Sequence, residues 1–288
     1  MKKKFLFGAA TLIFACALFF GGTFTAEAEM PFYGLNPKPL VERSVFCTFY
    51  GNSSFERKHN ISLAVKSING VFVDIGGEFS FNRTVGRRTK EKGYKQAKII
   101  VGDGFVEGTG GGVCQVSTTL YNAVLNAGLK ITEYHAHSLA VSYVSPSFDA
   151  MVNYGSADLR FINDTDNPVI IYAFCDGETI TVKIVGEKAD FTIKRQSEIT
   201  ERVKAPDPFI EYDTEGKYPD LKEGEKTVVS YGKDGIKSKA VFVKIYKNGK
   251  KEYFIRKDFY KPVRGKIIVG TAKAAEETPE EVSAPDGN

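Results

Sequence analysis

The sequence predicts an α+β domain with mixed helices and antiparallel strands, followed by a small elongated all-β module. In the first two thirds of the chain, some segments repeat apolar residues at helical spacing and others alternate like strands, without a regular β-α-β repeat. Beyond a boundary near residues 190–200, helical spacing disappears and prolines and glycines separate short alternating segments. The predicted domains are residues 29–190 and 197–271.

The N-terminus has the pattern of a secretory signal peptide over residues 1–28. Lysines at 2–4 precede an apolar segment over 5–20, and Ala26-Glu27-Ala28 is a small-x-small cleavage site. The mature chain then starts at Glu29 and is secreted, extracellular or cell-wall associated. The alternative is an uncleaved membrane anchor, since the apolar residues 5–24 are just long enough to span a bilayer. Only in that case does the protein contact a membrane.

The first domain begins with prolines at 31, 37 and 39, which predict an irregular entry segment over 29–60. Ile61, Ala64, Val65 and Ile68 repeat at helical spacing and predict a helix over 60–68. The segments that follow predict strands over 71–73 and 79–81, a hairpin of 97–101 with 104–107, strands over 130–134 and 139–144, paired strands over 159–162 and 168–174, and a hairpin onto 179–186.

The second domain contains short alternating segments over 227–229, 240–246 and 267–270, which predict strands separated by glycine turns. Residues 272–288 contain Glu, Pro, Ala and Ser without aromatic residues, so they predict a disordered acidic tail. The formal net charge of +4 at pH 7 is too small for 288 residues to predict nucleic-acid binding.

The most informative stretch begins at Gly110, where three glycines immediately precede Cys114. Apolar residues from 116 to 127 then share one helical face, and Gly128 predicts the helix end. Cys114 therefore falls in the first turn, where unpaired N–H groups and the helix dipole favour a reactive thiolate. The bare backbone of Gly111 and Gly112 would let a substrate approach and would offer N–H donors to an oxyanion.

Each of these residues also has a structural interpretation. A free cysteine behaves as a small apolar residue and is often simply buried. Gln115 is a candidate oxyanion donor and Ser117 a candidate substrate contact. Serine and threonine near a helix start also cap it, which is the alternative role for Ser117 and Thr118.

A thiolate nucleophile needs a base, and the candidates are His135 and His137, just after the predicted helix. In an extended segment both side chains point to the same side. We prefer His137, because it opens the predicted strand over 139–144 and the sheet would position it. The same side chains with Cys114 and an aspartate form the alternative of a zinc site. The leading assignment includes neither a metal nor a cofactor.

Asp149 and Asp158 are the candidates for the group that orients the histidine ring. We prefer Asp149, because it stands beside apolar residues, where a carboxylate needs a reason to be present. Asp158 could instead pair with Arg160, and either aspartate could be a turn residue. The predicted catalytic residues are therefore Cys114, His137 and Asp149.

Cleavage of the signal peptide removes Cys16 and leaves Cys47, Cys114 and Cys175. An odd number of cysteines leaves at least one thiol free or paired outside the chain. Two arrangements remain open from the sequence: a Cys47–Cys175 disulfide with Cys114 free, and three reduced cysteines.

The first domain resembles the VanW family, named from its occurrence in vancomycin-resistance clusters of Gram-positive bacteria. The similarity runs from about Phe46 to Gly186. The family has no settled activity, so the resemblance does not decide between an enzyme and a binder. One departure is the segment 145–148, where the family tends to have a glycine-bearing turn. The similar segments are 60–64, 77–82, 93–94, 110–125, 137–138 and 149–150.

The second domain, residues 197–271, resembles a G5 domain, through Leu221 and the glycines at 224, 232, 235, 249 and 270. This resemblance implies a cell-wall location and binding to peptidoglycan or another glycan that contains N-acetylglucosamine. The leading hypothesis is a cell-envelope protein that uses Cys114 for acyl transfer on wall peptides. The rival is a non-catalytic wall-binding module in which Cys114 is structural.

Overall fold

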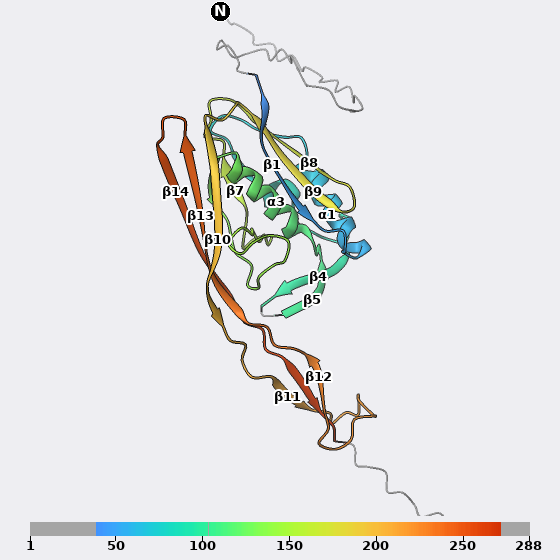
Figure 1. Cartoon of the computed structure of the whole chain (residues 1–288). Helices are drawn as coiled ribbons and strands as arrows, with labels where there is room; N and C mark the ends of the chain where they lie inside the picture. Colours follow the sequence, from blue (N-terminus) through green and yellow to red (C-terminus); the bar gives the residue numbers. More distant parts are fainter. Residues whose placement is uncertain (1–38, 103, 272–288) are drawn as a thin grey trace, which may run out of the picture. The chain divides into compact units, whose positions relative to one another are not determined.

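The computed structural model describes residues 39–102 and 104–271, which all belong to one structural unit. Its N-terminal part contains a four-stranded antiparallel sheet with the order β1-β9-β8-β2 (Figure 1). The strands are β1 (Val41–Phe49), β2 (Val71–Val73), β8 (Val169–Cys175) and β9 (Thr179–Gly186).

Two helices pack against this sheet and against each other: α1 (Phe55–Ile68) contacts β8, and α3 (Val113–Asn126) contacts β1 and β9. Every second residue of β9 is buried, as expected for a strand with one face toward the helices. Ile61, Leu120 and Ile184 are fully buried in the resulting core. Burial of each such side chain contributes about 1.5–3 kcal/mol.

Two predictions near the start of the domain need correction. The helix predicted over 60–68 begins five residues earlier, at Phe55, because the Ser54 hydroxyl accepts a hydrogen bond from the Arg57 N–H and caps it. The irregular segment predicted over 29–60 was wrong over 41–49, where β1 forms. Its prolines end at Pro39, before the strand, so they do not interrupt the pairing with β9.

The other N-terminal sheets are small. β3 (Glu78–Ser80), β7 (Arg160–Ile162) and β6 (Lys130–Glu133) form one, and β4 (Gln96–Val101) with β5 (Gly104–Thr109) forms the predicted hairpin. A short helix, α2 (Phe81–Val85), was not predicted. The predicted pairing of 159–162 with 168–174 was wrong, because β7 pairs with β3 and β6 while β8 pairs with β2 and β9.

Residues 134–159, between β6 and β7, follow an irregular path, and the strand predicted over 139–144 was wrong. The segment is fixed by contacts with α3. The Ser117 hydroxyl donates to the Ala150 carbonyl at 2.6 Å, and the Ala150 N–H donates to Thr118 Oγ1 at 2.9 Å. We call residues 134–159 the site loop, because it carries His137 and Asp149.

In the described residues after 186, the regular elements are all strands, in two three-stranded sheets. The first C-terminal sheet has the order β10-β13-β14, and the second has the order β11-β15-β12 with β11 parallel to β15 (Figure 1). The strands are β10 (Phe191–Val203), β11 (Phe209–Tyr212), β12 (Lys226–Ser230), β13 (Gly235–Tyr246), β14 (Lys251–Tyr260) and β15 (Lys266–Val269).

The boundary predicted near 190–200 lies inside β10, which continues through residues 191–203, so the structure has no linker there. Hydrogen bonds also cross this boundary. Arg195 Nη1 donates to Asn122 Oδ1 at 2.8 Å, and the hydroxyls of Ser147 and Ser238 lie 2.7 Å apart. The first C-terminal sheet is therefore joined to α3 by a partly buried hydrogen bond and to the site loop by a buried one.

Cys47, Cys114 and Cys175 are free thiols in the described structure. Cys47 on β1 pairs in register with Thr181, and Cys175 on β8 pairs with Ile180, so β9 separates the two cysteines. Two strand spacings amount to about 9–10 Å, whereas a disulfide needs Cα atoms within about 7 Å. The Cys47–Cys175 disulfide considered above therefore does not fit this sheet.

The signal peptide predicted over 1–28 and the acidic tail predicted over 272–288 lie outside the described residues. Within the described ranges, none of the helices has the length and apolar composition to cross a membrane. The longest two, α1 and α3, have 14 residues each, and a membrane-spanning helix needs about 20.

Candidate active site

α3 begins at a glycine loop that has no room for side chains. Gly112, at the N-cap, has φ of 110°, a left-handed conformation. A Cβ at Gly111 would lie 2.7 Å from the Ala97 carbonyl oxygen. The glycines thus let the loop pack against β4 and α1. In the described part of the chain, the N–H groups of Gly111, Gly112 and Cys114 have no hydrogen-bond partner, so the helix begins with free donors.

Cys114 is the second residue of α3, and its thiol is partly buried. Its Sγ donates to the Val152 carbonyl at 3.4 Å. Burial disfavours the thiolate, but the hydrogen bond and positive charge of His137 outweigh it and lower the pKa of Cys114 below its usual value. The positive charge of Arg88 lowers this pKa further. Cys114 is therefore biased toward the thiolate.

His137 and Asp149 form a buried pair within the site loop. His137 Nδ1 lies 2.7 Å from Asp149 Oδ2, and the His137 backbone N–H donates to the same oxygen at 2.7 Å. Burial disfavours the imidazolium, but hydrogen bonds to Asp149 and Cys114 raise the pKa of His137 to about 9. Asp149 has a lowered pKa, because its contacts with His137 outweigh the effect of burial. With Nδ1 engaged, Nε2 is the ring nitrogen left for the thiol.

The first C-terminal sheet holds the other oxygen of Asp149. The Tyr260 hydroxyl donates to Asp149 Oδ1 at 2.5 Å, and Arg256 Nη2 lies 3.3 Å from the same atom. Arg256 Nη1 also donates to the Asp149 backbone carbonyl at 2.6 Å. We did not predict these two residues. Their four-residue spacing places them on one face of β14. An arginine on the same strand face as a tyrosine was the one sequence feature that could have indicated a buried partner.

Ser147 turns the site loop into Asp149 with φ of 63°, the one left-handed non-glycine residue in the described ranges. This turn lies in the segment 145–148, where the resembled family tends to have glycine. A serine here is held by its contacts: its N–H donates to the Tyr260 hydroxyl at 2.7 Å, and its hydroxyl pairs with Ser238. Such strain of order 1–3 kcal/mol persists only where the surroundings determine the conformation.

Gln115 and Ser117, predicted as oxyanion or substrate contacts, have other partners in the structure. Gln115 Nε2 donates to Thr48 Oγ1 at 3.2 Å and to the Phe49 carbonyl at 2.8 Å. The Ser117 hydroxyl donates to the Ala150 carbonyl, and Ser117 is fully buried. Both side chains therefore join α3 to neighbouring segments, and the free donors at the site are backbone N–H groups.

His135 and Asp158 lie apart from the thiol. His135 Nε2 is 2.9 Å from Glu133 Oε1. Asp158 Oδ2 accepts from Ser80 at 2.5 Å and from Arg160 Nε at 3.1 Å, which is the pairing given above as its alternative role. Within the described residues, no three His, Cys, Asp or Glu side chains are arranged to hold a metal ion. The zinc alternative therefore lacks a ligand set in this part of the chain.

Tyr143 and Arg88 are further neighbours of the site that we did not predict. Burial, then the negative charges of Cys114 and Asp149, raise the pKa of the Tyr143 phenol, which also hydrogen-bonds to Thr118. Burial lowers the pKa of Arg88, and the charge of Cys114 opposes this. Tyr143 lies in the stretch 139–144, which was predicted as a strand. That incorrect prediction gave no indication that its side chain lies near Cys114.

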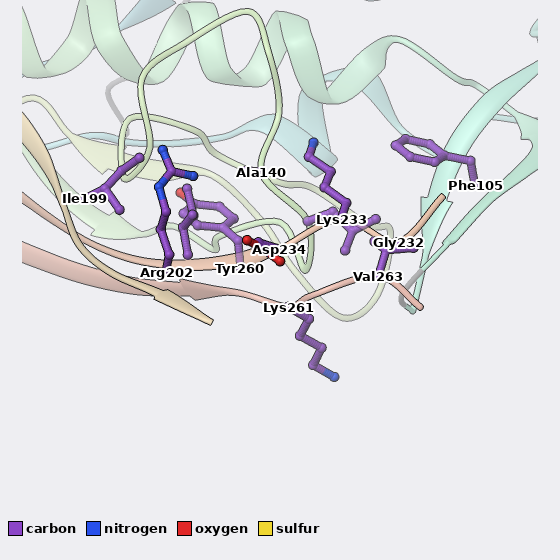
Figure 2. A pocket seen from close by; sticks show the side chains of 12 residues that line it. Phe105, Ala140, Ile199, Arg202, Gly232, Lys233, Asp234, Tyr260, Lys261 and Val263 are labelled. Carbon is purple, nitrogen blue, oxygen red and sulfur yellow. The ribbon is translucent and has the colours of Figure 1, made fainter. Parts of the chain in front are cut away.

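A pocket of about 470 Å³ lies between the site loop and the first C-terminal sheet (Figure 2). Cys114, His137 and Asp149 are absent from its lining. Tyr260 belongs to both places, since it lines the pocket and its hydroxyl donates to Asp149. The charged residues in the lining are Arg202, Lys233, Asp234 and Lys261.

A thiol at a helix start, a histidine beside it and a carboxylate behind the histidine form the arrangement of cysteine-dependent hydrolases and acyltransferases. The sequence comparisons relate this domain to a known family. Residues 56–185 match the family described as VanW like protein, so this part of the chain is similar to that family. The match falls within the range of about 46–186 predicted above.

Two curated proteins show the same relationship. The chain is 41% identical over 164 residues to the uncharacterized protein YoaR of Bacillus subtilis (strain 168), a match that covers 54% of each chain. It is 29% identical over 155 residues to the vancomycin B-type resistance protein VanW of Enterococcus faecalis (strain ATCC 700802 / V583), covering 49% of this chain and 56% of that protein. The chain therefore spans about half the length of the curated relatives it matches.

Among solved structures, the crystal structure of HP0197-G5 aligns over 28% of this chain and 100% of its own, at 20% identity. The TM-score of 0.16 is too low to establish a shared fold. The G5 resemblance of residues 197–271 therefore stays a prediction.

Proposed function

We propose that this protein acts on peptidoglycan in the cell envelope, with Cys114 as the nucleophile of acyl transfer on a wall peptide. The observation that carries the proposal is the buried His137–Asp149 pair, 2.7 Å apart, whose imidazole acts on Cys114 at the start of α3. The lowered pKa of Cys114 and the raised pKa of His137 favour a thiolate–imidazolium pair. Such a pair provides both the nucleophile and the general acid.

In the proposed reaction, the Cys114 thiolate attacks an amide carbonyl, and free N–H groups at the start of α3 bind the oxyanion. The C–N bond then breaks, His137 gives its proton to the leaving amine, and a thioester remains on Cys114. Water or an amine attacks the thioester, His137 takes the proton, and the thiolate leaves. The product is a hydrolysed peptide with water and a new amide with an amine. Asp149 keeps the imidazole oriented throughout.

The predicted signal peptide and the sequence similarity support a place in the envelope. Residues 1–28 have the pattern for export, and one relative is a vancomycin resistance protein by name. We infer that the protein is secreted and stays associated with the cell wall, and that its partner is peptidoglycan.

The test is to compare the full chain with its Cys114→Ser variant on purified peptidoglycan. We expect Cys114→Ser to abolish any change in the muropeptide profile, with a nearly unchanged melting temperature, because the swap alters nucleophilicity far more than volume. Cys47→Ser is the matched control, because Cys47 is an exposed free thiol in the same chain. Full activity in Cys114→Ser would show that the thiol is not the nucleophile.

A non-catalytic binding role has separate support in the second C-terminal sheet. Phe209 and Tyr212 on β11, and Tyr231 directly after β12, expose 52%, 61% and 84% of their surface. Exposed aromatic rings can stack on sugar faces, as in binding to glycans that contain N-acetylglucosamine. In this alternative, the sheet holds the protein on the wall and Cys114 is structural.

Sedimentation with insoluble peptidoglycan separates the two roles. Tyr212→Ala and Tyr231→Ala should weaken binding if the second sheet is the binding surface. Tyr253→Ala is the control, because Tyr253 is 63% exposed but lies on β14 of the first C-terminal sheet. Equal binding by all three variants would remove the support for glycan recognition by these rings.

A further inference from the structure

Arg88 lies against the glycine loop that starts α3. A Cβ at Gly110 would lie 2.8 Å from Arg88 Cβ and 3.1 Å from its Cγ, so the absent side chain leaves room for the arginine. Its guanidinium carbon stands 5.6 Å from the centre of the Phe81 ring. The stem and the head of Arg88 are therefore both held beside the loop that presents Cys114.

Asn82 fixes the guanidinium close to the thiol. Arg88 Nη1 donates to Asn82 Oδ1 at 2.6 Å, and Asn82 Nδ2 donates to the Asn153 carbonyl at 3.3 Å. The carbonyl one residue earlier, that of Val152, accepts from the Cys114 thiol. Two adjacent carbonyls of the site loop thus connect Arg88 to Cys114. The positive charge of Arg88 also contributes to the lowered pKa of Cys114, after burial and His137.

The second terminal nitrogen of Arg88 is buried and has no hydrogen-bond partner in the described ranges. Within the same ranges Arg88 is not within ion-pair distance of a carboxylate, and the negative charges of Cys114 and then Asp158 raise its pKa against the effect of burial. A buried charged donor without a partner is costly, and a guanidinium binds a carboxylate better than other common anions of peptides. The orphaned nitrogen beside the nucleophile therefore points to an anionic group on the substrate.

We propose that Arg88 binds a free carboxylate of the substrate, next to the amide that Cys114 attacks. This inference rests on the proposed function, with Cys114 as the nucleophile, and defines its substrate as a peptide cleaved at or near its C-terminal residue. One residue spans about 3.5 Å, so a C-terminal carboxylate lies close to the last amide carbonyl. Breaking that C–N bond releases the last residue with its carboxylate, as the proton passes from His137 to its amine.

Two small alkylating reagents test this without knowledge of the natural peptide. Iodoacetate and iodoacetamide differ in that only iodoacetate carries a carboxylate. On the full chain, the rate ratio of iodoacetate to iodoacetamide should be about tenfold higher at Cys114 than at exposed Cys47, since a charged hydrogen bond is worth about 1.5–3 kcal/mol. Mass spectrometry of the two cysteine peptides gives both rates from one sample.

The variant Arg88→Gln should lower the ratio at Cys114 to that at Cys47. Arg87→Gln is the matched control, because Arg87 is exposed and stacks on Tyr154. A measurement on the unmodified protein does not depend on the folding of a variant: N-acetylalanine should protect Cys114 from iodoacetamide, and N-acetylalanine amide should not.

The possible failures are distinct. If Cys114 reacts with neither reagent in the folded chain, the proposed function fails together with this inference. If Cys114 reacts with both reagents at the ratio of Cys47, or if both acetylated compounds protect it equally, carboxylate binding is overturned and the nucleophile stands. If folded Arg88→Gln keeps a high ratio of iodoacetate to iodoacetamide rates at Cys114, Arg88 is not the group that binds the carboxylate.

Discussion

The two C-terminal sheets have three strands each, yet they differ in what their side chains contact. In the first, Arg256 and Tyr260 are 2% and 1% exposed, and both bind Asp149. In the second, Phe209 and Tyr212 on β11 are 52% and 61% exposed. The region predicted as one wall-binding module therefore contains two different sheets. The first completes the candidate active site, and the second exposes aromatic side chains to solvent.

The largest effect should come from Arg256→Ala in the first sheet. The substitution removes the guanidinium partner of Asp149, which keeps only His137, and also that of Asp258, whose carboxylate lies 2.6 Å from Arg256 Nε. Removal of one partner of a buried ion pair costs about 3–5 kcal/mol. Urea unfolding measures this loss, and a cost below about 1 kcal/mol would contradict the buried network.

Tyr260→Phe should have a smaller but clear effect. The hydroxyl donates to Asp149 and accepts from the Ser147 N–H, so its loss leaves the buried Ser147 N–H unpaired and removes one of the two donors to Asp149 Oδ1. We expect a destabilisation of about 1–3 kcal/mol. Tyr253→Phe on the same strand is the control, because Tyr253 is exposed and should tolerate the change. Equal unfolding curves for the two variants would exclude a supporting role for the Tyr260 hydroxyl.

The pH dependence of stability tests the ion pair that the first sheet supports. In the unfolded chain the pKa values of Cys and His are about 8.5 and 6.5, whereas in the folded protein that of Cys114 is lowered and that of His137 is about 9. With a folded thiolate, both states bind equal numbers of protons between about pH 6.5 and 8.5, because the proton only moves from Cys114 to His137. Stability should be nearly constant there and should fall as pH rises through 9.

Cys114→Ser should remove this plateau. His137 keeps a pKa raised by Asp149, so its stabilisation is complete below about pH 6.5 and is lost as the pH rises toward its folded pKa. The free energy of unfolding of the variant, measured in urea, should then decline between about pH 6.5 and 8.5 by roughly 1 kcal/mol per pH unit. Parallel curves for the variant and the parent chain would contradict a thiolate at Cys114.

The smallest effect should come from Lys266→Ala in the second sheet. Lys266 Nζ lies 2.8 Å from Glu211 Oε2, similar in length to the first-sheet contacts, but both side chains are more than a third exposed. Exposed pairs contribute about 0.2–1 kcal/mol, so unfolding in urea should barely change. A loss as large as that of Arg256→Ala would show that the two sheets do not differ in the proposed way.

The sequence allowed prediction of the features that depend on local pattern. The glycine loop and the apolar periodicity after Cys114 predicted α3, and the alternation around Asp103 predicted the hairpin of β4 and β5. Histidine and aspartate candidates followed from residue type and nearness in the chain. The structure brings His137, Asp149 and Cys114 together, whereas His135 instead faces Glu133.

Features that depend on distant contacts were beyond local pattern. The stretch 139–144 alternates like a strand, but it finds no pairing partner and becomes part of the site loop. Arg256 reaches Asp149 from 107 residues away, and periodicity within β14 carries no information about its partner. Local pattern places Arg88 only in a charged stretch, because its contact with Gly110 depends on the folded glycine loop.

The hold of β14 on Asp149 also fixes when the site can form. The ribosome makes Cys114, His137 and Asp149 first, and more than a hundred residues follow Asp149 before Tyr260 is added. Until then Asp149 lacks two of its partners, and Ser147 lacks the hydroxyl that holds its left-handed turn. A chain cut short before β14 would carry all three proposed catalytic residues without the contacts that orient them. The site can therefore assemble only after β14 has been synthesised, well after Cys114 itself.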